Sequence, residues 1–269
     1  MHDYPPIILA NGHGELRFQH VLLMGIVNIT PDSFYDGGRY DDTGAALAHM
    51  RGMAAAGADI IDIGGASSRP GYTPLDAELE IRRILPVFEA AADLEPPLSV
   101  DTDQPQVAAA ALAAGAALIN NCGRLSAEMA AVAAEYDAPL VLMQREGFRS
   151  GADVIAGMRE FFSRTLAFAE RHGLRREQLI LDPGLGFNKN AEQSMALLRH
   201  MDELLDFERP LLIGASRKRF VGVYYGGDTA GQRLSGSVQA ALEAARRGAA
   251  ILRVHDVAET AAALAGEDG

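Results

Sequence analysis

Residues 22–28 read Leu-Leu-Met-Gly-Ile-Val-Asn, a continuous apolar run that ends on a polar side chain. A strand with one solvated face would alternate apolar and polar residues, so this run predicts a strand buried on both faces, as in a parallel sheet. Seven further apolar runs follow at roughly even spacing, namely 60–64, 98–101, 118–120, 140–143, 179–182, 211–214 and 251–254. The fold therefore depends on how eight buried strands are connected.

Helical segments separate these runs, among them residues 43–56, 104–114, 153–172 and 230–247. Each of the four is followed by a glycine, the residue that most easily adopts the left-handed conformation beyond a helix end. Strand and helix alternate along the chain without a linker-like tract. This pattern predicts an α/β fold in which residues 1–269 form a single (β/α)8 TIM barrel domain. The alternative is an open doubly wound sheet, which eight regular units disfavour.

Two short runs precede the first long strand, at residues 7–9 and 15–18, on either side of Asn11-Gly12. This arrangement predicts an N-terminal β-hairpin, which we expect to close the bottom of the barrel.

The composition limits the function classes. The formal net charge is −12, which disfavours nonspecific binding to nucleic acid or to anionic membranes. Cys122 is the single cysteine, so an intrachain disulfide is excluded and a reducing compartment fits. The first residues lack the pattern of a signal peptide, and the apolar stretch 107–119 is too short to span a bilayer. We expect a cytoplasmic protein that acts on small molecules.

Polar residues end or follow every one of the eight apolar runs, where a barrel of this kind carries its chemistry. They are Asn28, Asp62, Asp101, Asn120 with Asn121, Gln144, Asp182, Ser216 to Lys218, and Arg253 with His255. Any one of them could simply cap the following helix. Their presence at all eight ends is better explained by a functional site.

The residue types in this set indicate the ligand. Asp101 and Asp182 accept hydrogen bonds, Asn120 both donates and accepts, and Lys218 donates, which suits the edge of a heterocycle such as an aminopyrimidinone. Arg253 and His255 are two residues apart on one strand, so they point to the same face and could hold phosphate oxygens. The chain has no HExxH, CxxC or Walker sequence. We therefore predict a site for a phosphate-bearing heterocycle.

Two loops after the first two strands, residues 30–38 and 64–71, combine glycine and proline with the charged residues Asp36 and Arg69. Such loops could close over a reacting centre, although an ordinary surface turn is the simpler alternative.

Seven motifs occur together and in order: GIVNITPDSFYDGG (25–38), DIGGASSRPG (62–71), SVDT (99–102), LIN (118–120), LDPGLGF (181–187), GASRK (214–218) and ILRVHDVAET (251–260). From about Leu22 to Thr260 the chain resembles the dihydropteroate synthases of the pterin-binding barrel superfamily. The resemblance implies condensation of 6-hydroxymethyl-7,8-dihydropterin diphosphate with 4-aminobenzoate and release of pyrophosphate, in folate biosynthesis. It also implies Mg²⁺ as cofactor and a homodimer formed through late helices, for which the Ala-rich residues 238–245 are candidates, although an Ala-rich face could equally pack against the barrel.

The resemblance assigns roles to individual positions of this chain. The pterin-binding set is Asp101, Asn120, Met143, Asp182, Lys218 and Arg253. The catalytic set is Asp36, Arg69, Lys218, Arg253 and His255. The acceptor-binding set is Ser68, Pro70, Phe187 and Arg219, and Asn28 corresponds to the metal-binding residue.

The chain also departs from the family pattern. Ala66, Ser68, Asn121 and Gln144 stand where Glu, Thr, Asp and His are usual, and Asn188 and Asn190 stand where Gly and Thr are usual. Arg219 replaces a serine expected near the aminobenzoate carboxylate. Either Arg219 faces solvent or an acidic neighbour and the acceptor is still 4-aminobenzoate, or it binds a larger, more anionic arylamine of the methanopterin type.

Two other functions remain open from the sequence. One is a pterin-binding paralogue without activity. The other is the pterin domain of a corrinoid methyltransferase, which holds no diphosphate, so that Arg253 and His255 argue against it.

Overall fold

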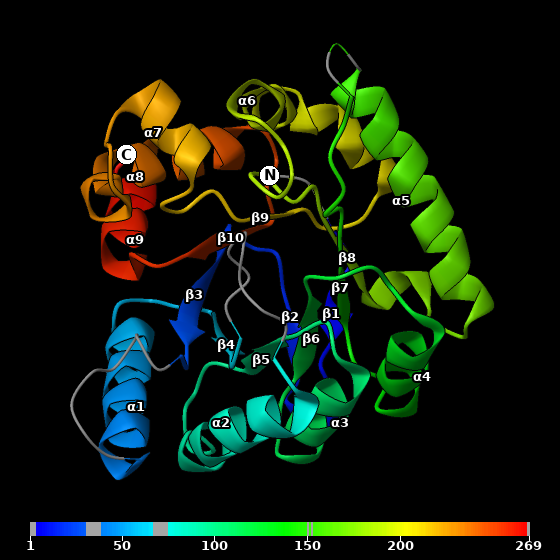
Figure 1. The fold of residues 1–269 in the computed structure, drawn as a ribbon, viewed down its shortest axis with the longest axis vertical. Helices are drawn as coiled ribbons and strands as arrows, with labels where there is room; N and C mark the ends of the chain where they lie inside the picture. The colour runs from blue at the N-terminus through cyan, green and yellow to red at the C-terminus, as the bar shows by residue number, and fades with distance from the viewer. Residues whose placement is uncertain (1–3, 31–38, 67–74, 150, 152, 268–269) are drawn as a thin grey trace.

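The computed structural model describes residues 4–30, 39–66, 75–149, 151 and 153–267. Eight parallel strands form a ring with helices outside it (Figure 1). The strands are β3 (Leu22–Asn28), β4 (Ile60–Gly64), β5 (Leu98–Asp101), β6 (Leu118–Asn121), β7 (Leu140–Met143), β8 (Leu179–Asp182), β9 (Leu212–Ile213) and β10 (Ile251–Val254). The helices are α1 (Arg39–Ala55), α2 (Ala77–Ala90), α3 (Pro105–Ala113), α4 (Ala127–Glu135), α5 (Val154–Arg171), α6 (Ala191–Arg199), α7 (Arg219–Tyr225), α8 (Leu234–Arg246) and α9 (Val257–Ala265).

The order of the strands confirms the predicted barrel. Hydrogen-bonded neighbours run β8-β7-β6-β5-β4-β3-β10-β9. A parallel bridge between Leu181 and Leu211 joins the two ends of this series, so the sheet is nearly closed. All consecutive pairs are parallel, which the runs buried on both faces had indicated.

Several predicted boundaries were wrong: α1 begins at Arg39 rather than at residue 43, and two further differences have a local cause. The seventh strand was expected over 211–214, but only Leu212–Ile213 form the ladder, because the chain leaves the sheet at Gly214 and turns at Ser216-Arg217, where Arg217 has a φ of 58°. The helix expected over 230–247 is divided into a 3-10 turn, η4 (Ala230–Gln232), and α8. The division lies at Arg233, whose guanidinium donates to the carbonyl oxygens of Gly227, Arg217 and Asp228 and ties this corner to the preceding loop.

The side chains that point into the barrel form two layers, because successive residues of a strand face opposite sides. The lower layer is apolar and consists of Leu22, Met24, Ile60, Leu118, Val141, Ile180, Leu212 and Ile251. Two residues further along the strands, the same face carries Asp62, Asn120, Met143, Asp182, Gly214 and Arg253. The barrel therefore has an apolar floor directly beneath a polar layer.

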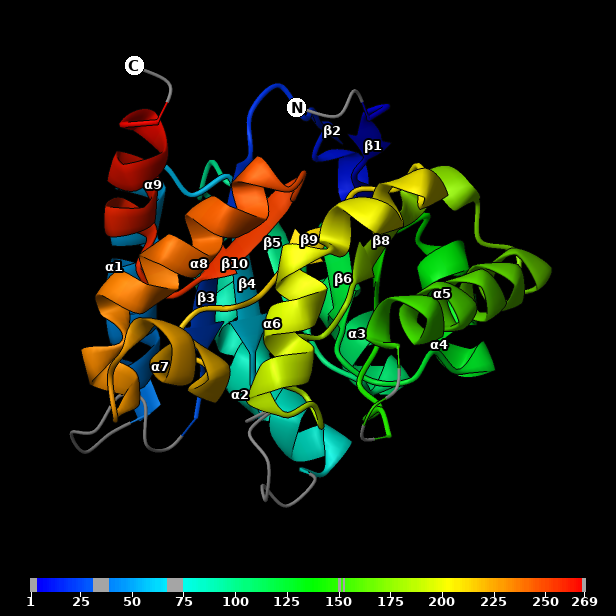
Figure 2. The same ribbon diagram turned by 90° about the horizontal axis from the view of Figure 1, so that it is seen from above.

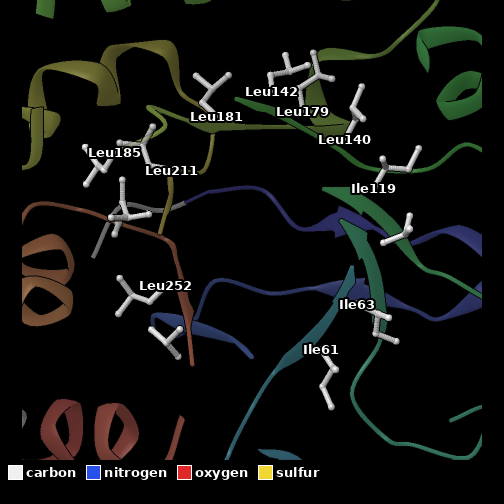
Figure 3. Close-up of a cluster of buried hydrophobic side chains, with 14 of the residues drawn as sticks. Ile61, Ile63, Ile119, Leu140, Leu142, Leu179, Leu181, Leu185, Leu211 and Leu252 are labelled. Atoms are coloured by element: carbon white, nitrogen blue, oxygen red, sulfur yellow. The ribbon is translucent and has the colours of Figure 1, made fainter. Parts of the chain in front are cut away.

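The residues between these positions point outward and pack beneath the helices. Figure 3 shows part of this shell, in which Ile61 and Ile63 of β4, Leu140 and Leu142 of β7 and Leu252 of β10 are buried with their neighbours. Burying a side chain of this size contributes about 1.5–3 kcal/mol. The outer shell thus holds the strands in register and leaves the inward polar positions free for chemistry.

The predicted N-terminal hairpin is present at one end of the molecule (Figure 2). Strands β1 (Ile7–Ile8) and β2 (Glu15–Leu16) pair in antiparallel fashion around the 3-10 turn η1 (Ala10–Gly12). Asn11 has a left-handed φ of 56°, and its Nδ2 donates to the oxygens of Leu112 and Ala116 at 2.8 and 2.9 Å. The hairpin side chains pack on the lower layer, so the hairpin closes the bottom of the barrel as expected.

Within the described part of the chain, no helix is both long enough and apolar enough to cross a membrane.

Candidate active site

Arg253 organises one half of the polar layer. Its Nε donates to Asp62 Oδ2 at 2.6 Å, and its Nη2 donates to Asp101 Oδ2 at 2.5 Å. Asn120 Nδ2 donates to the same Oδ2 of Asp62 at 2.8 Å. Asp62 is fully buried, at 0% exposure, and Asp101 is buried as well. One cation from β10 therefore faces two buried carboxylates, one from β4 and one from β5.

Asp62 was predicted at a strand end, and that placement was wrong. The residue lies in the middle of β4, paired with Ile26, and β4 continues to Gly64. It points inward because it is two residues beyond Ile60 of the lower layer. Applying that period of two along the strand would have identified Asp62 as an inward-pointing side chain, the position from which it pairs with Arg253 and Asn120.

Asp182 and Lys218 form the other half. Asp182 Oδ1 accepts from the backbone N–H of Gly184 at 2.7 Å, and Lys218 Nζ donates to the oxygen of Leu185 at 2.5 Å. Lys218 also lies 4.3 Å from the centroid of the Phe187 ring. Gly184 has a φ of 63°, and a Cβ there would lie 2.0 Å from the Gln144 oxygen, so the turn after β8 requires glycine.

Both halves border one small hollow at the mouth of the barrel. Its lining consists of Asp101, Asn120, Cys122, Met143, Asp182, Phe187, Gly214, Lys218 and Arg253. All six residues that the resemblance assigned to the pterin are in this lining, together with Phe187 from the acceptor set. Asp101 Oδ1 is buried and has no hydrogen-bond partner among the described residues. A ligand with a donor group would satisfy that atom.

Burial changes the acidities of the charged groups. It raises the pKa of Asp101 to about 6, although Arg253 opposes the shift. Burial also raises the pKa of Asp182, against the attraction of Lys218. The same effect lowers the pKa of Lys218 to about 8, which Asp182 partly offsets. Near neutral pH both Asp101 and Lys218 are charged.

A second group of polar residues lies beyond the hollow, at the ends of β3 and β10. His255 Nδ1 is 3.0 Å from Ser216 Oγ, and the His255 N–H donates to that oxygen at 3.2 Å. Arg217 makes a two-pronged ion pair with Asp256. Asn28 is the half-buried last residue of β3, next to β10 in the sheet. None of these side chains is in the lining of the hollow.

Arg219 is exposed and begins α7. It is absent from the lining of the hollow, and no carboxylate in the described ranges forms an ion pair with it. Asp36, Ser68, Arg69 and Pro70, which the sequence assigned to the closing loops, lie outside the described residues.

Several departures from the family pattern have local structural roles. Asn121 exchanges hydrogen bonds with the backbone of Gly123, and Asn190 is the N-cap of α6 in a reciprocal pair with Gln193. Asn188 adopts a φ of 46° and donates through Nδ2 to the Arg145 oxygen at 3.1 Å. The side-chain oxygen of Gln144 is buried without a partner in the described structure.

Comparison with known proteins gives consistent matches. The sequence profile described as pterin binding enzyme matches residues 24–255. The dihydropteroate synthases of Synechocystis sp. and of Escherichia coli K12 are each 41% identical, over 95% and 93% of this chain and 92% of each relative. A structure of Xanthomonas albilineans dihydropteroate synthase with 4-aminobenzoic acid superposes with a TM-score of 0.89 at 41% identity, covering 98% of both chains. The complex of that enzyme with 7,8-dihydropteroate gives a TM-score of 0.89 at 40% identity, again over 98% of each chain.

Proposed function

The chain belongs to the dihydropteroate synthases of the pterin-binding enzyme family, transferases of folate biosynthesis, and on that premise we propose how its side chains divide the reaction. The observation that carries the proposal is the hollow itself. Two carboxylates, one amide and one ammonium from four different elements converge on it, above an apolar floor.

In the proposed complex the dihydropterin lies in this hollow. Asp182 and Asp101 accept from its N–H groups, Asn120 offers an amide, and Lys218 donates to its carbonyl or ring nitrogen. Met143 contributes an apolar surface, and the guanidinium of Arg253 contacts the ring. The buried, unpartnered Oδ1 of Asp101 supports a role as acceptor.

The chemical step breaks the bond between the pterin methylene carbon and the diphosphate oxygen, and the electron pair leaves with pyrophosphate. The resulting cation is delocalised over the dihydropterin, next to the Asp101 and Asp182 carboxylates. Arg253 and His255, with Arg69 and Asp36 from the two loops, are proposed to stabilise the charges that separate. The aniline nitrogen then attacks the methylene carbon and loses a proton, which needs orientation rather than a strong base.

We propose Mg²⁺ as the cofactor, held through Asn28 and the substrate's diphosphate. The described residues contain no group of three or more His, Cys, Asp or Glu that could hold an ion. A single protein ligand, Asn28, fits a Mg²⁺ ion that arrives with the diphosphate, because Mg²⁺ keeps several waters and takes few protein ligands. When bound, it would neutralise charge on the leaving group.

The acceptor is proposed to lie against Phe187, with Ser68 and Pro70 from the second loop and Arg219 near its carboxylate. The position of the Phe187 ring over Lys218, on the lining of the hollow, supports this side of the site.

Two further proposals concern the oligomeric state of the enzyme and its location in the cell. Residues 238–245 were candidates for a dimer interface. Ala240, Ala241 and Ala244 instead belong to the hydrophobic core of the protein itself. Val223, Tyr224 and Leu234 on α7 and at the start of α8 are exposed large apolar side chains. We propose that a homodimer uses this neighbouring surface instead, and that the protein is cytoplasmic.

The assignment is tested with purified protein, dihydropterin diphosphate, Mg²⁺ and 4-aminobenzoate. We expect pyrophosphate and dihydropteroate in equal amounts, followed by a coupled phosphate assay and by mass spectrometry. Binding of the pterin substrate without any product would contradict the synthase and favour an inactive paralogue. Methyl transfer from methyltetrahydrofolate would favour the methyltransferase.

Replacing Arg219 by Ser is expected to raise the KM for 4-aminobenzoate by no more than about fivefold, because an exposed charge contributes only about 1 kcal/mol or less. Steady-state kinetics at saturating pterin substrate measures this change. A much larger increase would indicate that Arg219 holds the carboxylate directly. Turnover of a phosphorylated ribosyl-aminobenzene in preference to 4-aminobenzoate would support the alternative acceptor.

Pterin binding is expected to be strongest between about pH 6 and about pH 8. Below the raised pKa of Asp101 the carboxylate is protonated and loses its charge, and above the lowered pKa of Lys218 the ammonium becomes neutral. Calorimetric titration uses 6-hydroxymethylpterin, which lacks the diphosphate. The pH dependence of its affinity therefore contains no contribution from ionisation of the phosphates. In Asp101→Asn the acidic limb should shift to lower pH or flatten, and an unchanged limb would exclude Asp101 as its source.

A further inference from the structure

Two loops at the mouth of the barrel are joined by side chains of one loop that donate to carbonyl oxygens of the other. Lys189 Nζ donates to the Gln144 oxygen at 2.9 Å, and Asn188 Nδ2 donates to the Arg145 oxygen at 3.1 Å. Gln193 Nε2, at the start of α6, donates to the oxygens of Phe148 and Arg149. We call these four contacts the loop seam. It makes the loops after β7 and β8 one unit.

Lys189 is the buried member of the seam, with 8% exposure. Besides the Gln144 oxygen, its ammonium donates to the oxygens of Gly184 and Phe187 at 3.0 and 3.2 Å. A lysine ammonium has three N–H donors and no acceptor. All three donors are used by the backbone, so Lys189 has none left for a substrate.

The carbonyls that Lys189 holds belong to functional segments. Gly184 donates its N–H to Asp182 Oδ1, and Phe187 lines the hollow. The Phe187 ring lies near two cations, with Lys218 at 4.3 Å and the Arg145 guanidinium at 6.0 Å from its centroid. Lys189 therefore fixes the backbone of Phe187 between the two groups that pack on its ring.

We propose that Lys189 is a positioning residue for the arylamine acceptor, acting through the backbone of Phe187. The inference rests on the proposed function, because it takes Phe187 as the surface that covers the acceptor. The three hydrogen bonds of Lys189 fix this side of the mouth in advance, so binding the acceptor does not have to order it. Asp182 still accepts from the Gly184 N–H when Lys189 is altered, so we expect a larger effect on the acceptor than on the pterin.

The test replaces Lys189 by Met, which keeps the length and removes the donors, and by Arg, which keeps the charge. We expect Lys189→Met to raise the KM for 4-aminobenzoate about tenfold to a hundredfold, the range that a displacement of about 1 Å can cause. The KM for the pterin substrate should change less than about twofold, and Lys189→Arg should recover part of the loss, since a guanidinium also donates to carbonyls.

The matched control is Asn188→Gly, which removes the neighbouring seam contact and favours the left-handed φ. It leaves the three hydrogen bonds of Lys189 in place, so both KM values should stay near those of the wild type. If Lys189→Met proves too unstable to purify, the selective rise in acceptor KM must appear in Lys189→Arg.

Equal rises in both KM values, or a lower melting temperature with both KM values unchanged, would overturn the inference and leave Lys189 a general stabilising residue. A wild-type protein that forms no dihydropteroate would instead refute the proposed function, and the Lys189 inference with it. The two failures are therefore distinguishable.

Discussion

Arg253→Met is expected to lower the free energy of unfolding by about 3–5 kcal/mol, the usual cost of removing one partner from a buried ion pair. It should also abolish detectable synthesis of dihydropteroate. The reason is the cluster in which one guanidinium faces Asp62, at 0% exposure, and Asp101, at 8%. Without Arg253 two buried carboxylates would repel each other in a region of low polarity. Urea unfolding monitored by circular dichroism, with the coupled product assay, measures both effects.

The double variant Arg253→Met/Asp62→Asn separates stability from activity. Removing one of the two negative charges should restore part of the lost stability, because less charge remains uncompensated. Activity should remain absent, since the cation proposed to contact the pterin and the diphosphate is still missing. Recovery of activity together with stability would mean that Arg253 has a structural role alone.

Asp182→Asn is expected to weaken binding of the dihydropterin diphosphate about tenfold to 150-fold, because a hydrogen bond to a charged group contributes about 1.5–3 kcal/mol. The substitution is nearly isosteric. The Asn side-chain oxygen can still accept from the Gly184 N–H, so the turn after β8 should keep its shape. What is lost is the charge and one acceptor facing the ligand. Isothermal titration calorimetry with the natural substrate measures the change.

Asp103→Asn is the matched control for that variant. The Asp103 side chain is 49% exposed, lies 3.4 Å from the Arg145 guanidinium, and does not line the hollow. Neutralising it changes the net charge by the same amount as Asp182→Asn. Pterin affinity should therefore stay within about twofold of the wild type, because exposed ion pairs contribute little. Equal losses in the two variants would point to a general charge effect rather than to a contact of Asp182.

Much of the barrel could be predicted from the sequence because a parallel strand buried on both faces leaves an unbroken apolar run. Residues 22–28 and 251–254 were predicted as strands with the boundaries that β3 and β10 have. The prediction of the seventh strand was less accurate, because a ladder of two residues contains too little sequence pattern to place its end. The break at Arg233 was missed because it depends on contacts between a side chain and a distant turn.

The residues of the candidate site also differ in how far the sequence could reveal them. Asp101, Asn120 and Asp182 could be found because they end apolar runs, where the carboxyl ends of parallel strands meet. Asp62 was placed at a strand end without a role, although the alternation of side chains along β4 contained the necessary signal. Lys189 offered no such signal. A lysine in a polar loop is normally solvated, and only the fold brings three carbonyl oxygens to its ammonium.

The two layers inside the barrel have a consequence for how the chain reaches its native state. A slip of one residue in β4 would turn Asp62 outward into the shell beneath the helices and leave Arg253 facing an isoleucine. Such a misaligned barrel would bury charges without partners and would be strongly disfavoured. Arg253, proposed to contact the substrate, and its partner Asp62 therefore also select the correct strand alignment during assembly. Recovery of catalytic activity on refolding should for this reason report directly on alignment, and not only on compaction.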